Sequence, residues 1–293
     1  MKISLALGGG GVRGNAHIGV LRVLEQRGYQ IEAMAGTSMG GLIGAVYLAG
    51  NTPDDIEERL ANADFRTLFR RGSDVQNALL GQTGLVELLH EYLGELSFEE
   101  LPIPFAVPAV DLVTGLEVVL KTGRLLDAVL ATTAVPGVFP PRIMGDYELV
   151  DGGLSNPVPV ALARSLAPRL PVIAVAMTRP PEPHRHLPQS SIVPSMPVLD
   201  RLTQFRIGQA FSVFTRSISI SGRLLAELRL AVEKPELIIR PDVDEYGILD
   251  RVDVHEMVAR GEAAAEIELS KWELRNTLSF KAALAFNRLF KRN

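Results

Sequence analysis

Four consecutive glycines occupy residues 8–11, and the loop that they begin continues through Arg13 to Gly14. Consecutive glycines adopt backbone conformations that are closed to other residues, so they can turn several N–H groups toward one point. A segment with helical periodicity follows, and the start of a helix adds partial positive charge at the same place. The loop is therefore expected to bind an anion, which is either a phosphate or a transient oxyanion.

The choice between these anions stays open on this loop alone. Gly9, Gly11 and Gly14 fit the G-x-G-x-x-G pattern of dinucleotide-binding folds, and Glu32 lies near the offset expected for a ribose-binding acid. That acid belongs at the end of the second strand, whereas Glu32 falls at the start of one. The P-loop pattern fails, because no Lys-Ser/Thr pair follows Gly14.

Residues 36–40 read Gly-Thr-Ser-Met-Gly and lie between an expected strand and an expected helix. In such an elbow, Gly36 and Gly40 permit the sharp reversal that holds Ser38 exposed at the strand end, as a nucleophile requires. The usual α/β-hydrolase places several strands before its serine and a histidine after it. Here one strand and the glycine loop precede the strand that leads into Ser38, so the elbow occurs without that fold.

A base for Ser38 is not evident among the histidines, none of which follows an expected strand. These are His17, His90, His184, His186 and His255. Asp151 does follow a strand, and Gly152 and Gly153 come directly after it. A desolvated carboxylate beside a serine can accept its proton. The alternative is that Asp151 caps a turn, which is a common use of Asp-Gly.

Residues 8–14, 36–40 and 151–153, in this order, resemble the motifs of the patatin-like phospholipase family. Residues 8–21 and 131–141 are most similar to its bacterial branch, which is akin to the neuropathy target esterase catalytic domain. The resemblance covers roughly residues 3–180. After residue 178 it becomes weak, so the last third is judged on composition alone.

The resemblance implies hydrolysis of lipid acyl esters by a Ser–Asp dyad without a cofactor. Ser38 would be the nucleophile and Asp151 the base. The N–H groups around Gly9, Gly10 and Gly11 would form the oxyanion hole, and Arg13 would shape or charge that loop. The implied substrate is a phospholipid or lysophospholipid. A regulatory or adaptor protein on the same fold is the alternative, because a fold does not define a function.

Two further features concern the pocket of such an enzyme. Thr132 and Thr133 replace a more usual serine-containing pair, a change expected to alter packing without touching the chemistry. Apolar residues between positions 65 and 89 either line an acyl tunnel or belong to the core. They are Phe65, Phe69, Leu79, Leu80, Leu85, Leu88 and Leu89.

Apolar runs of strand length alternate with helical periodicity, which is typical of a mainly parallel sheet in an α/β fold. Strands are expected at residues 3–7, 31–35, 105–112, 116–121, 148–150, 172–177 and 236–240, and helices at 16–26, 40–48, from 53, and 124–133. With the resemblance, this pattern predicts a three-layer α/β/α architecture and a more helical C-terminal third.

The composition describes one large globular core, with 293 residues, 47% hydrophobic and 22% charged. A net charge of -4 lacks the basic footprint of a nucleic-acid binder, and the absence of cysteine excludes thiolate chemistry. No metal cluster is apparent. The first apolar run is too short for a secretory signal, and the glycines within residues 33–53 disfavour a membrane span. A cytoplasmic location is expected.

The last residues differ in charge from the rest. Residues 271–293 carry six basic residues and one acidic residue, a net charge of +5, against -9 for residues 1–270. Apolar positions recur there on one helical face. We therefore expect an acyl hydrolase domain at 1–270 and a basic amphipathic helix at 271–293, which either lies on an anionic membrane or docks on the domain.

Overall fold

The computed structural model describes the backbone of residues 1–64, 80–180 and 201–290, and the side chains of residues 1–64, 80–180 and 213–277. The strands of this part form one sheet in the order β5-β6-β3-β2-β1-β7-β8, and β4 also pairs with β3. They are β1 (Lys2–Leu7), β2 (Gln30–Gly36), β3 (Phe105–Asp111), β4 (Glu117–Leu120), β5 (Arg142–Met144), β6 (Tyr147–Asp151), β7 (Val172–Val175) and β8 (Leu237–Ile239). The neighbours β3-β2, β2-β1, β1-β7 and β7-β8 pair parallel. The neighbours β3-β4, β3-β6 and β5-β6 pair antiparallel. The mainly parallel sheet is confirmed.

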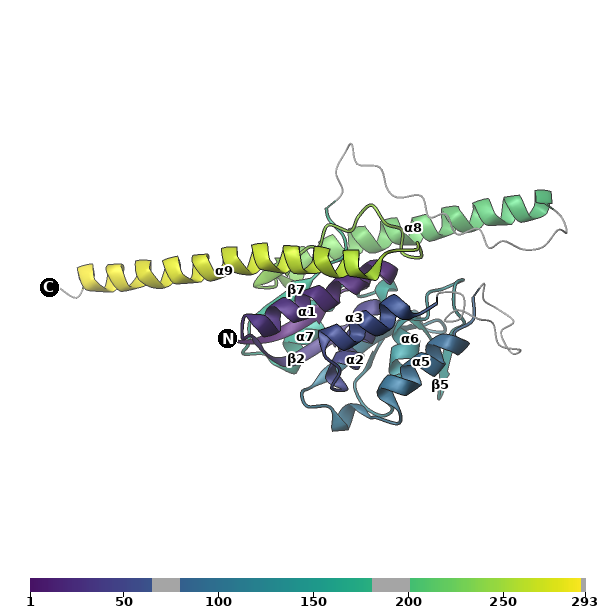
Figure 1. Ribbon diagram of the computed structural model, residues 1–293, viewed down its shortest axis with the longest axis horizontal. Helices are drawn as coiled ribbons and strands as arrows, with labels where there is room; N and C mark the ends of the chain where they lie inside the picture. The colour runs from purple at the N-terminus through teal and green to yellow at the C-terminus, as the bar shows by residue number, and fades with distance from the viewer. Residues whose placement is uncertain (65–79, 181–200, 291–293) are drawn as a thin grey trace.

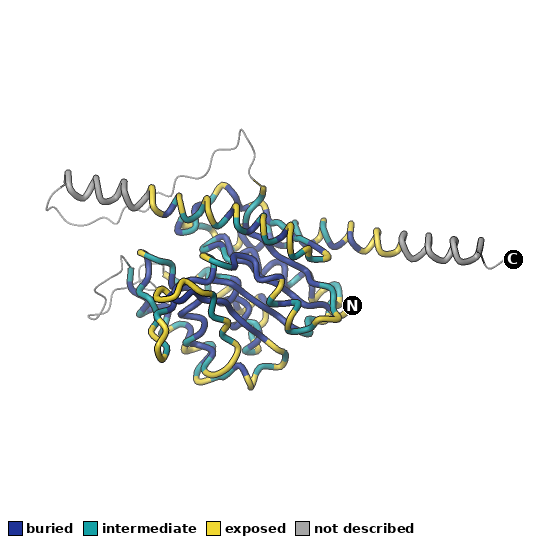
Figure 2. The backbone as a smooth tube through the Cα atoms, turned by 180° about the vertical axis from the view of Figure 1, so that it is seen from behind, coloured by how far each residue is buried: buried dark blue, intermediate teal, exposed yellow. Residues whose placement is uncertain are grey.

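Helices cover both faces of the sheet. Leu5 and Leu7 of β1 belong to one apolar cluster, and Ala6 between them belongs to another, because side chains alternate along a strand. The first cluster includes residues of α1 (Ala16–Gln26), α2 (Met39–Leu48), α3 (Pro53–Asn62), α5 (Thr83–Leu93) and α6 (Leu125–Thr132), and the second includes residues of α7 (Val160–Leu166) and α8 (Arg201–Glu233). Figure 2 shows buried backbone segments at the centre of the molecule. The three-layer α/β/α architecture is confirmed.

The local sequence signals coincide with the observed elements at several places. α1 has the expected bounds, and α3 begins at Pro53 behind Thr52, whose side chain forms a capping box with Asp55. β3 and β4 form the expected hairpin. The short strand β5 and the 33-residue helix α8 were not expected from the sequence. The described residues also contain the short 3-10 helices η1 (Gly11–Asn15), η2 (Phe98–Glu100) and η3 (Gly152–Leu154).

The C-terminal third is dominated by two long helices that project from the body in opposite directions, α8 and α9 (Val254–Phe290) (Figure 1). α9 packs on the body past residue 270, because Trp272 is buried and stacks on Tyr29 with ring centroids 6.2 Å apart. The helix continues without a break past residue 271. The division at 270/271 therefore stays a prediction, and most of the basic amphipathic helix expected at 271–293 lies outside the described side chains, which end at residue 277.

α9 crosses α1 where both helices carry glycine. A Cβ atom on Gly19 would lie 2.0 Å from the carbonyl oxygen of Val258, and one on Gly261 would lie 2.0 Å from that of Ala16. Such distances leave no room for any side chain. The two backbones therefore approach as closely as glycine allows.

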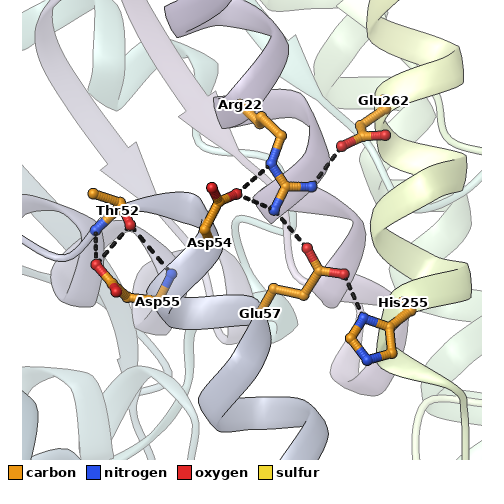
Figure 3. Close-up of polar contacts among 7 residues, drawn as sticks. All are labelled: Arg22, Thr52, Asp54, Asp55, Glu57, His255 and Glu262. Atoms are coloured by element: carbon orange, nitrogen blue, oxygen red, sulfur yellow. Dashed lines mark hydrogen bonds and ion pairs between the residues drawn. The ribbon is translucent and has the colours of Figure 1, made fainter.

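An ion-pair network secures the same crossing from the side (Figure 3). Arg22 of α1 donates to Glu262 of α9 at 2.5 Å and to Asp54 and Glu57 of α3. Glu57 also accepts from Nδ1 of His255 at 2.6 Å, which raises the pKa of that imidazole. The first turns of α9 are thus tied to α3 as well as to α1.

Candidate active site

The two glycine motifs meet at one edge of the sheet because β1 and β2 are parallel neighbours. Leu7, the last residue of β1, is in register with Gly36, the last residue of β2. The loops that follow both strands therefore begin side by side. The Thr37 N–H donates to the carbonyl oxygen of Leu7 at 2.9 Å and joins them.

Asp151 reaches the same place from an antiparallel strand. β3 extends beyond β2, since Ala35 pairs with Ala106 whereas Asp151 pairs with Ala109, three residues further along β3. The last residue of β6 therefore lies past the end of β2, where the elbow begins. Sequence order alone does not show this, because it depends on the β3–β6 register.

The elbow at Ser38 is sterically tight. Ser38 has φ 53° and ψ -124°, a left-handed backbone conformation that L side chains rarely adopt. A Cβ atom on Gly40 would lie 2.3 Å from the carbonyl oxygen of Leu7, and one on Gly36 would lie 2.5 Å from that of Gly40. Both flanking glycines are therefore required for close backbone approach, as the elbow pattern predicts.

Ser38 and Asp151 are in direct contact. The Ser38 hydroxyl donates to Oδ2 of Asp151 at 2.5 Å, and the Gly153 N–H donates to the other carboxylate oxygen at 2.7 Å. Asp151 thus caps its turn and also contacts the serine, and its role as a base stays a prediction. Burial raises the pKa of Asp151 to about 6, against the opposing effect of the hydrogen bonds from Ser38 and Gly153.

Two of the three glycine N–H groups expected to face an oxyanion are without a hydrogen-bond acceptor in the described chain. The Gly9 N–H donates to the carbonyl oxygen of Pro157 at 2.9 Å, so this amide is already used, and the expectation that it serves an oxyanion is corrected. Within the described chain the N–H groups of Gly10 and Gly11 have no acceptor. All three glycines line the same cavity as Ser38. The N–H groups of Gly10 and Gly11 therefore remain as the candidate hydrogen-bond donors to an oxyanion.

Arg13 holds the orientation of this loop. Its Nε donates to the carbonyl oxygen of Gly10 at 3.1 Å. Because the carbonyl and the N–H of a trans peptide point in opposite directions, this bond also directs the Gly11 N–H away from the guanidinium. Burial lowers the pKa of Arg13 to about 10, so the side chain remains charged at neutral pH.

No histidine is the hydrogen-bond partner of Ser38 in the described chain. His17 is fully buried, and its Nε2 donates to the carbonyl oxygen of Gly8 at 2.7 Å. Burial lowers the pKa of His17 to about 4, so the ring is neutral and supports the glycine loop. His90 and His255 lie near Glu95 and Glu57 on the surface. His184 and His186 lie outside the described residues.

Thr132 contacts the backbone of Ser38, so the expectation that the threonine pair alters packing alone is corrected. Its Oγ1 accepts from the Ser38 N–H at 3.1 Å and donates to the carbonyl oxygen of Pro108 at 2.6 Å. The hydroxyl therefore links the strained elbow to β3. The sequence carried no signal for this contact, because it depends on how α6 packs against the sheet.

A cavity of about 210 Å³ lies beside these groups and is lined mostly by apolar side chains. Of the expected tunnel residues, Leu85, Leu88 and Leu89 of α5 line it, whereas Leu80 packs in a small cluster with Val138 and Phe139. Phe65, Phe69 and Leu79 lie outside the described residues. Other lining residues had been missed, although their i, i+4 spacing in α2 and α3 is visible in the sequence: Leu42, Val46, Ile56 and Leu60.

The described residues contain neither a candidate membrane span nor a candidate metal cluster. No helix there is both long and apolar enough to cross a bilayer. No group of three or more His, Asp or Glu side chains there is arranged to hold a metal ion.

The elbow serine, the aspartate and the glycine loop thus lie together at one edge of the mainly parallel sheet of an α/β fold. The family model described as patatin-like phospholipase matches residues 5–164. The chain belongs to the patatin-like phospholipase family. The resemblance inferred from the three motifs is therefore confirmed.

Curated relatives carry names of the same family. Two NTE family proteins of Mycobacterium tuberculosis, both named as uncharacterized, are 37% identical over 162 residues and 29% identical over 277 residues, covering 55% and 92% of this chain. The chain spans about half their length, 45% and 46%. The mouse patatin-like phospholipase domain-containing protein 6 is 31% identical over 185 residues, which cover 59% of this chain and 13% of that protein. Among solved structures, VipD from Legionella pneumophila aligns with a TM-score of 0.45 and 11% identity over 92% of this chain and 66% of that one.

Proposed function

We propose that this chain is a serine lipid acyl hydrolase of the phospholipase or lysophospholipase type. The observation that carries the proposal is the hydrogen bond from Ser38 to Asp151 at the wall of a mostly apolar cavity. Membership of the patatin-like phospholipase family supports a lipid as substrate. The apolar lining suits an acyl chain, and the serine suits its ester carbonyl.

In the first half-reaction Ser38 attacks the ester carbonyl while Asp151 accepts the hydroxyl proton. The carbonyl oxygen becomes an oxyanion that accepts hydrogen bonds from the Gly10 and Gly11 N–H groups. As the intermediate collapses, the C–O bond to the leaving alcohol breaks, and Asp151 returns the proton to that alcohol. The acyl group remains as an ester on Ser38.

In the second half-reaction water attacks the acyl-serine ester, and Asp151 accepts a proton from this water. Collapse of the second oxyanion breaks the bond to Ser38, which takes the proton back, and a fatty acid leaves. One carboxylate serves as base and then as acid in each half. Its raised pKa, about 6, suits both roles, because it leaves the group ionised at neutral pH and still able to hold a proton.

Two substitutions test the dyad. Ser38→Ala and Asp151→Asn should each lower kcat for a p-nitrophenyl ester and for a lysophospholipid on the order of 10⁴-fold. Ser165→Ala, which removes an exposed hydroxyl from α7, is the matched control and should keep wild-type rates. Thermal unfolding of each variant checks the fold. Wild-type rates in either dyad variant, or loss of activity on replacing His184, His186 or His255, would reject this mechanism.

The adaptor alternative predicts a well-folded wild-type protein with no turnover of any ester. The retained Ser38–Asp151 contact and the strained conformation of Ser38 argue against it, because a binding module has no use for either. The dinucleotide alternative is weaker. Glu32 pairs with Lys2 at 2.8 Å, at the beginning of β1 and β2 and thus away from the glycine loop. Titration with a nicotinamide cofactor should show no binding.

We further propose peripheral contact with anionic membranes through residues 271–293. The support is their charge, six basic residues against one acidic residue. Co-sedimentation with vesicles containing anionic lipid should be stronger for the full chain than for a chain ending at residue 270. Equal binding by both forms would reject this role. The cytoplasmic location stays a prediction.

A further inference from the structure

One wall of the candidate active-site cavity comes from α8, which lies beyond the residues that the family model matches. Figure 1 shows this helix on the side of the molecule away from α3 and α5, which supply much of the apolar wall. The lining residues of α8 are Ile218, Ser219, Gly222, Arg223 and Ala226. Arg223 is the charged residue among them, and it requires an explanation in a lipid pocket.

Arg223 is deeply buried. It is 8% exposed, and its Nη2 donates to Oδ1 of Asp244, which is 3% exposed, at 3.0 Å. This is the hydrogen bond that the guanidinium makes within the described chain, and Arg223 itself lines the cavity. The ion pair with Asp244 lowers the penalty of burial and orients the planar group.

A second buried cation lies nearby. Arg13 lines the same cavity, and Nε is the atom of its guanidinium that makes a hydrogen bond in the described chain. Burial lowers its pKa, the negative charge of Asp244 opposes this, and the positive charge of Arg223 lowers the pKa further. The two arginines line the same cavity, and their positive charges oppose each other there. The negative charges of Asp244 and Asp250 offset that repulsion.

The cavity thus combines an apolar wall, a reactive serine and two buried arginines. In a phospholipid the phosphate lies only a few bonds from the acyl ester, whereas a neutral acylglycerol has no anion. Arginine binds phosphate oxygens with charge-assisted and often paired hydrogen bonds. A lipid with its acyl chain along α5 can therefore bring a phosphate toward α8.

We propose that Arg223, together with Arg13, binds the phosphate of the substrate headgroup and makes the enzyme prefer phosphate-bearing lipids to neutral acylglycerols. This inference rests on the proposed function of the Ser38 site. Arg223 is then a specificity-determining residue supplied by the C-terminal third of the chain.

The test compares two substrates with the same oleoyl chain, lysophosphatidylcholine and monooleoylglycerol, in matched detergent micelles. For the full chain, Arg223→Gln should lower the ratio of the two kcat/KM values roughly ten- to a hundredfold, because one charge-assisted contact is lost. Arg223→Lys should retain part of the preference. Arg229→Gln is the matched control, because Arg229 lies on the same helix and pairs with Glu117 and Glu233 outside the cavity. It should leave both rates unchanged.

Asp244→Asn separates ligand binding from the ion pair. If Arg223 binds the substrate, this variant keeps or increases the preference for lysophosphatidylcholine, since the cation remains and its competitor is gone. If the ion pair only secures α8, Arg223→Gln and Asp244→Asn each lower kcat/KM equally for both substrates. A ratio unchanged in Arg223→Gln overturns the proposal.

A binding measurement separates this proposal from the proposed function. In the Ser38→Ala background, lysophosphatidylcholine below its micellar concentration should bind at least tenfold more weakly when Arg223→Gln is added. If this loss of affinity is observed but the wild-type protein hydrolyses neither lipid, the proposed hydrolase function is refuted and the proposed phosphate site is still supported. Glycerol phosphate, which lacks the acyl chain, should compete only weakly. Equal affinity for glycerol phosphate and the lipid would indicate a free-phosphate site and overturn the headgroup assignment.

Discussion

Ser38 Oγ and Asp151 Oδ2 lie 2.5 Å apart although 113 positions separate the two residues in the chain. Each partner is held by its own turn, Ser38 by the glycine-flanked elbow and Asp151 by the Gly153 N–H. Both side chains are buried, so the contact lies in a region of low dielectric, where a hydrogen bond is strong. The pair is organised before any substrate arrives.

The pH profile of activity should have an acidic limb, in which activity falls as the pH drops below about 6. Burial raises the pKa of Asp151 to about 6, and the protonated carboxyl cannot accept the serine proton. The value of kcat/KM should therefore rise about tenfold per pH unit below pH 6 and level off above it. Fatty-acid release from a lysophospholipid between pH 4.5 and 8 measures this. A limb centred below pH 4.5 would contradict a buried aspartate as base.

The same residue should make stability depend on pH. The pKa of Asp151 rises from 3.8 to about 6 on folding, so the folded state binds this proton more tightly than the unfolded chain does. Its contribution to the free energy of unfolding therefore falls by about 3 kcal/mol as the pH rises from about 4 to 6. Asp151→Asn has no such titration. In urea unfolding, the free energy of unfolding of Asp151→Asn should increase relative to that of the wild type across this interval and then keep a constant difference. A difference that does not depend on pH would refute the prediction.

His17 should support the glycine loop without acting as a base. Burial lowers its pKa to about 4, so it does not titrate where the Asp151 limb is expected. His17→Gln can keep a donor to the Gly8 carbonyl oxygen, and we expect it to retain the pH profile with a loss of less than about tenfold in kcat. His17→Ala removes the donor and leaves a cavity, so it should unfold about 2 kcal/mol more easily. Disappearance of the acidic limb in His17→Gln would show that the limb belongs to the imidazole.

Thr132 should act as a positioning residue for Ser38. Thr132→Val keeps the shape but leaves the Ser38 N–H and the Pro108 carbonyl oxygen without their partner. We expect kcat to fall roughly tenfold with little change in KM, because the elbow relaxes while the pocket is retained. Thr132→Ser restores the hydroxyl and should restore kcat. Equal losses in both variants would mean that packing, and not the hydroxyl, matters.

The crossing of α1 and α9 should not tolerate alanine. In Gly261→Ala the new Cβ would lie 2.0 Å from the Ala16 carbonyl oxygen, so the helices must separate, and the variant should lose about 2 kcal/mol or more of unfolding free energy. Gly222→Ala in α8 is the matched control, because nothing lies within 4 Å of its Cβ. It should be stabilised by about 0.5–1 kcal/mol through helix propensity. Destabilisation of similar size in both variants would rule out the close crossing as the cause.

The local motifs could be predicted from the sequence because their causes are local. Apolar periodicity defined α1, and the glycines at 36 and 40 indicated the elbow around Ser38. The position of Asp151 before two glycines indicated a turn at the end of a strand, which β6 and η3 confirm. Each of these signals lies within a few residues and needs no distant partner.

The tertiary structure decided which groups meet. The Pro157 carbonyl oxygen takes the Gly9 N–H, Thr132 takes the Ser38 N–H, and Arg223 enters the cavity from a helix with no motif. These contacts depend on strand register and on which helix covers which face of the sheet. Both are set by burial summed over the whole chain, and no short stretch of sequence encodes that sum.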